Sequence, residues 1–99
     1  MSNQFGEKIR SLRESNGLLL REVAPLLNID TPQLSKIERG ERQSKKEYIE
    51  MFAQVFKVDV NELLKIWLAD QMYNVIEGEP LAKEAIKELT IVVNKIHNN

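Results

Sequence analysis

Two short amphipathic stretches follow each other closely, and this arrangement constrains the fold more than any other feature of the chain. The first stretch has apolar residues on one helical face over 20–27, and the second reads Asp-Thr-Pro-Gln-Leu-Ser-Lys-Ile-Glu over 30–38. Asp30 has a Gln three positions on, which is the spacing of a capping box. Pro32 is tolerated in a first helical turn, because its missing N–H would have no partner there. With Gly40 as the stop, the pattern predicts two short helices joined by a tight turn.

Four further segments have apolar residues at helical spacing, and no alternating pattern predicts a strand. The first contains Phe5, Ile9 and Leu12, with Ser2 or Asn3 as the cap, and the second contains Ile49, Phe52, Ala53 and Phe56. The third starts at Asp59, has its apolar residues over 63–68 and runs to Tyr73 or Ile76. The fourth covers 81–96. A Gly-Glu-Pro break at 78–80 separates the last helix from the rest. The sequence therefore predicts an all-α fold.

The net charge of −1 is divided unevenly along the chain. Residues 1–46 carry nine Lys/Arg against six Asp/Glu, a balance of +3, whereas residues 47–99 carry five against nine, a balance of −4. The positive part surrounds the two short helices, which favours an anionic partner there. The chain has no cysteine and one histidine, His97 near its end, so we expect no metal site and no cofactor.

The residues also argue against membrane and enzyme functions. No apolar run approaches the ~18 residues of a membrane span, and the N-terminus lacks a signal pattern. We therefore expect a cytoplasmic protein with no membrane partner. Glu38 could be mistaken for a catalytic acid, but no second carboxylate, nucleophile or histidine stands at a plausible spacing from it. We expect no enzymatic activity.

Several short sequences resemble the helix-turn-helix family of phage repressors and Cro-like proteins, the Xre family. They are Gly-Leu-Leu-Leu-Arg-Glu-Val-Ala at 17–24, Ile-Asp at 29–30, Leu-Ser-Lys-Ile-Glu-Arg-Gly at 34–40 and Phe-Lys-Val-Asp-Val-Asn-Glu-Leu-Leu at 56–64. The resemblance covers about residues 5–70. It implies a five-helix lambda-repressor-like DNA-binding domain over 1–70, followed by an added C-terminal helix in an extension over 71–99.

The resemblance assigns base-reading positions to the outer side of the second short helix. These positions are Thr31, Pro32 and Lys36, with Gln33 and Ser35 flanking them. Lys36 can donate to guanine O6 and N7, and Gln33 can pair with adenine. Thr31 and Pro32 can touch a thymine methyl group, although the alternative is that they only start the helix.

Basic residues after that helix are the predicted phosphate contacts. They are Arg39, Arg42, Lys45 and Lys46, with Glu41 as the only acidic residue among them. Such contacts supply salt-dependent affinity without sequence information. The alternative for each residue is a solvated charged loop.

Arg13 and Glu38 have a structural role in the resemblance, as a charged pair that braces the recognition helix from behind. The chain departs from the family at Leu19 and Leu20, which stand where a small hydroxyl residue and Gln usually cap the first short helix and grip a phosphate. Arg21 is the residue expected to take over that phosphate contact. Pro25, inside the same stretch, predicts a kink or a shorter helix.

The C-terminal third is expected to hold a dimer interface, because two-fold dimers place two recognition helices about 34 Å apart on successive major grooves. The predicted interface residues are Trp67, Met72, Tyr73, Ile76, Leu81, Ala85, Leu89, Val92 and Ile96. The alternative is that the last helix completes the core of its own chain.

The resemblance and the charge pattern together favour a sequence-specific double-stranded DNA-binding transcriptional regulator that acts as a homodimer. Its recognition helix would cover about 31–39 and lie in the major groove. The alternative is an antitoxin-like or restriction–modification controller module, which would also bind a protein partner through its C-terminal helix.

Overall fold

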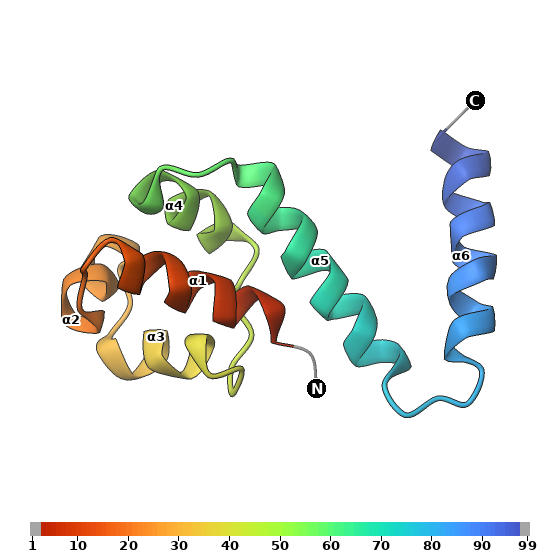
Figure 1. The fold of residues 1–99 in the computed structure, drawn as a ribbon, viewed down its shortest axis with the longest axis horizontal. Helices are drawn as coiled ribbons and strands as arrows, with labels where there is room; N and C mark the ends of the chain where they lie inside the picture. The colour runs from red at the N-terminus through yellow and green to blue at the C-terminus, as the bar shows by residue number, and fades with distance from the viewer. Residues whose placement is uncertain (1–2, 98–99) are drawn as a thin grey trace.

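The computed structural model describes residues 3–97, and within this range the chain forms helices and no strand (Figure 1). The helices are α1 (Gln4–Ser15), α2 (Leu20–Val23), the 3₁₀ helix η1 (Ala24–Leu27), α3 (Thr31–Glu38), α4 (Glu47–Phe56), α5 (Val60–Ile76) and α6 (Ala82–His97). The predicted all-α fold with an added C-terminal helix is confirmed. Of the two residues expected to cap α1, Ser2 lies outside the described residues, and the Asn3 side chain makes no capping hydrogen bond.

Helices α1 to α5 enclose one apolar core. At its centre Phe52 is fully buried and meets the ring of Phe5 edge-on, with 5.7 Å between the ring centroids. Burying one such side chain stabilises the fold by about 1.5–3 kcal/mol. The buried members of the core are Phe5, Ile9, Val23, Ala24, Leu27, Ile29, Leu34, Ile37, Ile49, Phe52, Ala53, Phe56 and Leu63. None of them lies in α6, so the core closes without the last helix.

Helix α2 has only one turn, because Pro25 interrupts its hydrogen bonding. Proline has no N–H to donate to the Arg21 carbonyl, and the chain continues as the 3₁₀ helix η1. Asn28 ends η1 in the left-handed conformation, with a φ of 58° that Asn tolerates better than most residues. The predicted shortening is confirmed. Val23 and Leu27, one on each side of the break, are both fully buried.

The first turn of α1 packs directly against the end of α3. A Cβ atom built at the buried Gly6 would collide with the backbone oxygens of Ile37 and Glu38. Asn3 lies at the same junction, where its Nδ2 donates a hydrogen bond to the Glu38 carbonyl oxygen at 3.0 Å. The absence of a side chain at Gly6 therefore lets the two helices approach until their backbones meet.

Helix α6 stands apart from the five-helix body, beyond a bend that follows α5 (Figure 1). It has no buried residue, so it does not complete the core of its own chain. Helix α5 runs unbroken through residue 70, where the expected division between domain and extension falls. No helix between residues 3 and 97 is long and apolar enough to cross a membrane.

Replacing Gly6 with Ala should lower the free energy of unfolding by about 1–3 kcal/mol, because the added methyl group overpacks the contact between α1 and α3. Urea unfolding followed by circular dichroism measures this change. Ser11→Ala, at an exposed position of the same helix, is the matched control and should stay within about 0.5 kcal/mol of the parent chain. Equal stability of Gly6→Ala and the parent would contradict the close backbone approach.

Candidate nucleic-acid interface

Helix α3 has a capped N-terminus and a buried inner side. Asp30 Oδ1 accepts a hydrogen bond from the Gln33 N–H at 2.8 Å, a cap that typically contributes about 1 kcal/mol. Leu34 and Ile37 are 0% and 2% exposed, so they fix the rotation of the helix about its axis. The residues on the opposite side of α3 are consequently held facing outward.

All five predicted base-reading residues have at least partly exposed side chains. Pro32 and Lys36 are exposed and lie one turn apart, in the middle of the outer side of α3. Thr31, Gln33 and Ser35 are partly buried and lie toward its edges. The helix thus presents these residues on one surface, and their contacts with bases stay a prediction.

A bidentate ion pair attaches the inner side of α3 to α1. Arg13 Nε and Nη2 donate to Glu38 Oε2 and Oε1 at 2.7 and 2.9 Å, and the two side chains are 12% and 4% exposed. The third donor, Nη1, bonds the Leu18 carbonyl oxygen at 2.9 Å. The hydrogen bond to Glu38 raises the pKa of Arg13 and outweighs the opposing effect of burial, so the guanidinium stays charged. One side chain therefore holds both α3 and the segment that enters α2.

Helix α2 receives its cap from within its own first turn. Leu19 offers no side-chain acceptor, but its N–H donates to Glu22 Oε1 at 2.8 Å. Leu20 is partly buried and packs against the core, whereas Arg21 is exposed. Despite the departure from the family pattern, the Leu19 N–H is thus paired, and Arg21 is the exposed cation of α2.

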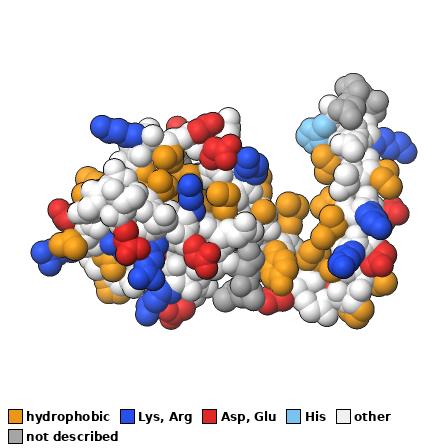
Figure 2. All heavy atoms as spheres, in the orientation of Figure 1, with side chains coloured by type: hydrophobic (Ala, Val, Ile, Leu, Met, Phe, Trp, Pro, Cys, Tyr) orange, Lys and Arg blue, Asp and Glu red, His pale blue; other side chains and the backbone are white. Residues whose placement is uncertain are grey.

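The segment after α3 carries the predicted phosphate contacts on exposed side chains. Arg42, Lys45 and Lys46 are exposed and have no acidic partner among the ion pairs of residues 3–97. Arg39 is also exposed, but its Nε forms an ion pair with Glu41 at 2.8 Å. Figure 2 shows Lys and Arg side chains gathered at the lower left of the molecule, where Figure 1 places α2 and α3.

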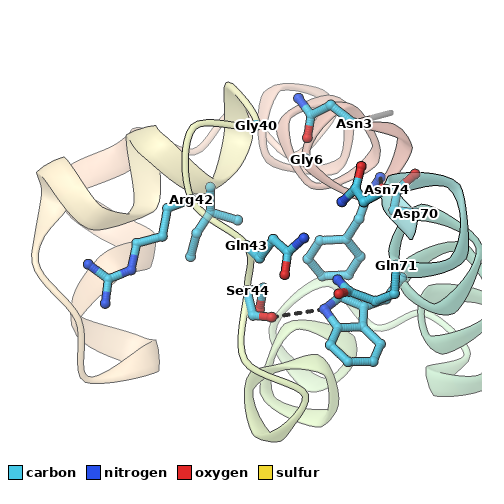
Figure 3. Close-up of a pocket in the computed structure, with 12 residues that line it drawn as sticks. Asn3, Gly6, Gly40, Arg42, Gln43, Ser44, Asp70, Gln71 and Asn74 are labelled. Atoms are coloured by element: carbon cyan, nitrogen blue, oxygen red, sulfur yellow. Dashed lines mark hydrogen bonds between the residues drawn. The ribbon is translucent and has the colours of Figure 1, made fainter. Parts of the chain in front are cut away.

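Residues 39–46, the basic segment after α3, pack against helix α5 at a small pocket of about 30 Å³ (Figure 3). There Trp67 Nε1 donates to the carbonyl oxygen of the buried Ser44 at 2.8 Å. In Figure 3 Arg42 extends away from this pocket. Trp67 thus differs from the other predicted dimer residues, since it packs against the core of its own chain and its hydrogen bond fixes the basic segment.

Asp70 is a buried residue of this support that sequence reasoning missed. Its carboxylate accepts hydrogen bonds from the backbone N–H groups of Gln4 and Phe5 at 3.2 and 2.8 Å, and the residue is 5% exposed. A carboxylate is stabilising at a helix N-terminus, where unpaired N–H groups and the helix dipole favour negative charge. Asp70 therefore caps α1 from α5. Its only signal in the sequence is a charge within an otherwise largely apolar helix.

Most of the other predicted dimer residues line an open groove of about 690 Å³ between α5 and α6. From the predicted set, the groove contains Met72, Tyr73, Ile76, Ala85 and Leu89. The remaining three do not line it: Val92 and Ile96 are exposed on α6, and Leu81 is exposed directly before α6. The structure thus brings eight of the nine residues to one region, and their role in a dimer stays a prediction.

Helix α2 with η1 and helix α3 are joined by a tight turn within the five-helix body, and α3 presents a polar outer face. This arrangement defines a helix-turn-helix protein. The helix-turn-helix domain family matches residues 4–65, and the chain therefore belongs to this family.

Two individual proteins are similar to the chain in sequence or in structure. It is 34% identical over 59 residues to the HTH-type transcriptional regulator DdrOP3 of Deinococcus deserti, a match that covers 60% of this chain and 46% of that protein. The chain thus spans about half the length of this relative. A crystal structure of a transcriptional regulator from Listeria innocua is 29% identical, with a TM-score of 0.57 and 97% of both chains covered. These similarities confirm the prediction that the chain is an Xre-like helix-turn-helix regulator.

Glu38→Gln should lower the free energy of unfolding by about 3 kcal/mol, because it leaves the charged Arg13 in a nearly buried site without its carboxylate. Thermal or urea unfolding measures the loss. Glu14→Gln is the matched control, since Glu14 pairs with Arg10 at 3.2 Å on the surface and should cost less than about 1 kcal/mol. A similar cost for the two variants would show that the buried pair does not anchor α3.

Proposed function

We propose that this protein is a sequence-specific double-stranded DNA-binding transcriptional regulator that acts as a homodimer, with α3 in the major groove. The observation that carries the proposal is the outward polar face of α3, fixed in rotation by Leu34 and Ile37 and fixed to α1 by Arg13 and Glu38. A helix can read base edges only if its side chains arrive in a defined register. Membership of the helix-turn-helix family supports DNA as the ligand.

The outer face of α3 offers two kinds of base contact. Lys36 supplies a charged donor for guanine O6 and N7, and the amide of Gln33 can both donate to and accept from adenine. Thr31 and Pro32 present a methyl group and a ring edge to thymine methyl groups. Ser35, a small hydroxyl residue beside Lys36 in sequence, completes the face.

Phosphate contacts flank α3 in the chain on both sides. Arg21 comes from α2, and Arg42, Lys45 and Lys46 come from the segment after α3. Arg39 belongs to the same set, but it must exchange its ion pair with Glu41 for a phosphate. We therefore expect Arg39 to contribute less net affinity than Arg42. Acting on chromosomal DNA, such a regulator would work in the cytoplasm and catalyse no reaction.

Selection of bound duplexes from a random pool tests the proposal directly. The parent chain should enrich a two-fold symmetric site whose half-sites lie about one helical turn, 34–36 Å, apart. Lys36→Ala should relax one base position in each half-site and cost ~1–3 kcal/mol on the selected site. Glu47→Gln, at an exposed position of α4, is the control and should return the parent profile. Absence of enrichment by the parent chain would overturn the proposed function, and an unchanged Lys36→Ala profile would overturn the role of Lys36.

Arg42→Ala should weaken binding to selected and unrelated duplexes alike, because a phosphate contact carries no sequence information. The slope of log K against log salt should fall by about one per subunit. Lys65→Ala removes another exposed cation, from α5, where Lys65 pairs with Glu62, and should leave the slope unchanged. Fluorescence anisotropy over a salt series measures both variants. A changed base preference with the parent slope would contradict the backbone role of Arg42.

A further inference from the structure

The groove between α5 and α6 is largely apolar on both walls, with Thr90 and Asn94 as the polar residues of the α6 wall. Met72, Tyr73 and Ile76 form part of the α5 wall, and Ile86, Leu89 and Val93 form part of the α6 wall. The α6 residues remain 45–48% exposed although they face the groove. Figure 2 shows hydrophobic side chains on the facing flanks of α6 and the body. Helix α6 therefore does not fill the groove beside its own α5.

Helix α6 has a second apolar flank that the groove does not use. Val92 and Ile96 lie beside the groove-facing residues on the helix surface, and Leu81 directly precedes the helix. These three residues are 47–69% exposed. The apolar stripe of α6 is thus wider than one wall of the groove requires. A stripe of this width suits a helix that packs against two other helices. In proteins, most of the stability of such an amphipathic helix comes from tertiary packing of its apolar face.

The charges of residues 71–97 fit a second copy better than a foreign charged partner. In residues 71–97 Lys83, Lys87 and Lys95 are set against four glutamates, at 77, 79, 84 and 88. The two signs alternate along α6 and nearly balance. An interface for an acidic or basic partner would carry one dominant sign, whereas a nearly balanced set of charges allows two copies to meet without net repulsion.

We propose that α6 of a second copy occupies this groove, and that the two copies do this reciprocally. The groove-facing residues Ile86, Leu89 and Val93 then meet the same residues of the other copy's α6. The second flank, with Val92 and Ile96, meets the other copy's α5 at Met72 and neighbouring residues. This inference rests on the homodimer of the proposed function and specifies how its two chains interlock.

The exposed apolar surface matches the needs of such a dimer. Of the large hydrophobic residues that are exposed, eleven fall within residues 68–96: Leu68, Met72, Tyr73, Val75, Leu81, Ile86, Leu89, Ile91, Val92, Val93 and Ile96. At roughly half exposure each, they offer on the order of 800 Å² per chain, the share of one partner in a standard interface. A two-fold exchange also covers both copies of α6 at once, as an isologous interface requires.

Pairwise disulfide trapping tests the exchange, and the absence of cysteine from the chain makes it direct. Met72→Cys and Val92→Cys are made in separate full-length chains, one carrying a size tag, and mixed in equal amounts without DNA. Oxidation by dissolved oxygen with copper phenanthroline should link the two chains, since a disulfide forms only where Cα atoms come within about 7 Å. The matched control replaces Val92→Cys by Glu84→Cys, on the polar side of α6, and should give at least tenfold less mixed dimer.

Sedimentation equilibrium of Leu89→Ala gives an independent measurement. The change should weaken association at least tenfold, since each dimer loses two groove-facing leucines. Gln54→Ala, at an exposed position of α4, should leave association unchanged. The proposal is overturned by a monomeric parent chain or by a dimer without the mixed disulfide. It is also overturned if a chain that carries both Met72→Cys and Val92→Cys forms its disulfide within one chain. A monomer that instead takes up an apolar ligand or peptide also overturns it. Cross-linked dimers that select no DNA would refute the proposed function while leaving the exchange intact.

Discussion

The attachment of α3 to α1 is the interaction on which the rest of the structure depends. It consists of a close backbone contact, which the absence of a side chain at Gly6 allows, and of the bidentate ion pair between Arg13 and Glu38. The two parts have different effects. The backbone contact brings the helices close together, whereas the ion pair adds little net stability, because both charges lose their hydration, but joins specific positions of the two helices. Together they define the position of α3 before any DNA is present.

The sequence predicted the elements of this fold well because they are encoded locally. Helical periodicity, the cap at Asp30, the break at Pro25 and the stop at Gly40 each depend on residues within a few positions of one another. The pairing of Arg13 with Glu38 spans 25 residues and could not come from periodicity. It was predicted because the resemblance to the Xre family carried that information across the chain.

The contacts that escaped prediction join segments far apart in sequence. Asp70 reaches the N-terminus of α1 across more than 60 residues, and Trp67 reaches Ser44 across 23. A lone Asp or Trp in an apolar helix does not reveal which distant group it meets. For the same reason the sequence does not show that Trp67, a predicted dimer residue, also packs against the core of its own chain. The groove was equally hidden, since its shape depends on the angle between α5 and α6.

Helix α5 is continuous from Val60 to Ile76, and this continuity has a geometric consequence. Its N-terminal half belongs to the core, its middle caps α1 through Asp70, and its last turns face the groove. A helix of that length is a stiff rod of roughly 25 Å. In the proposed dimer the length of α5 therefore determines the distance between the two copies of α3. One inserted residue near its end would turn the groove by about 100° around the rod, and both half-sites would lose their common phase on the duplex.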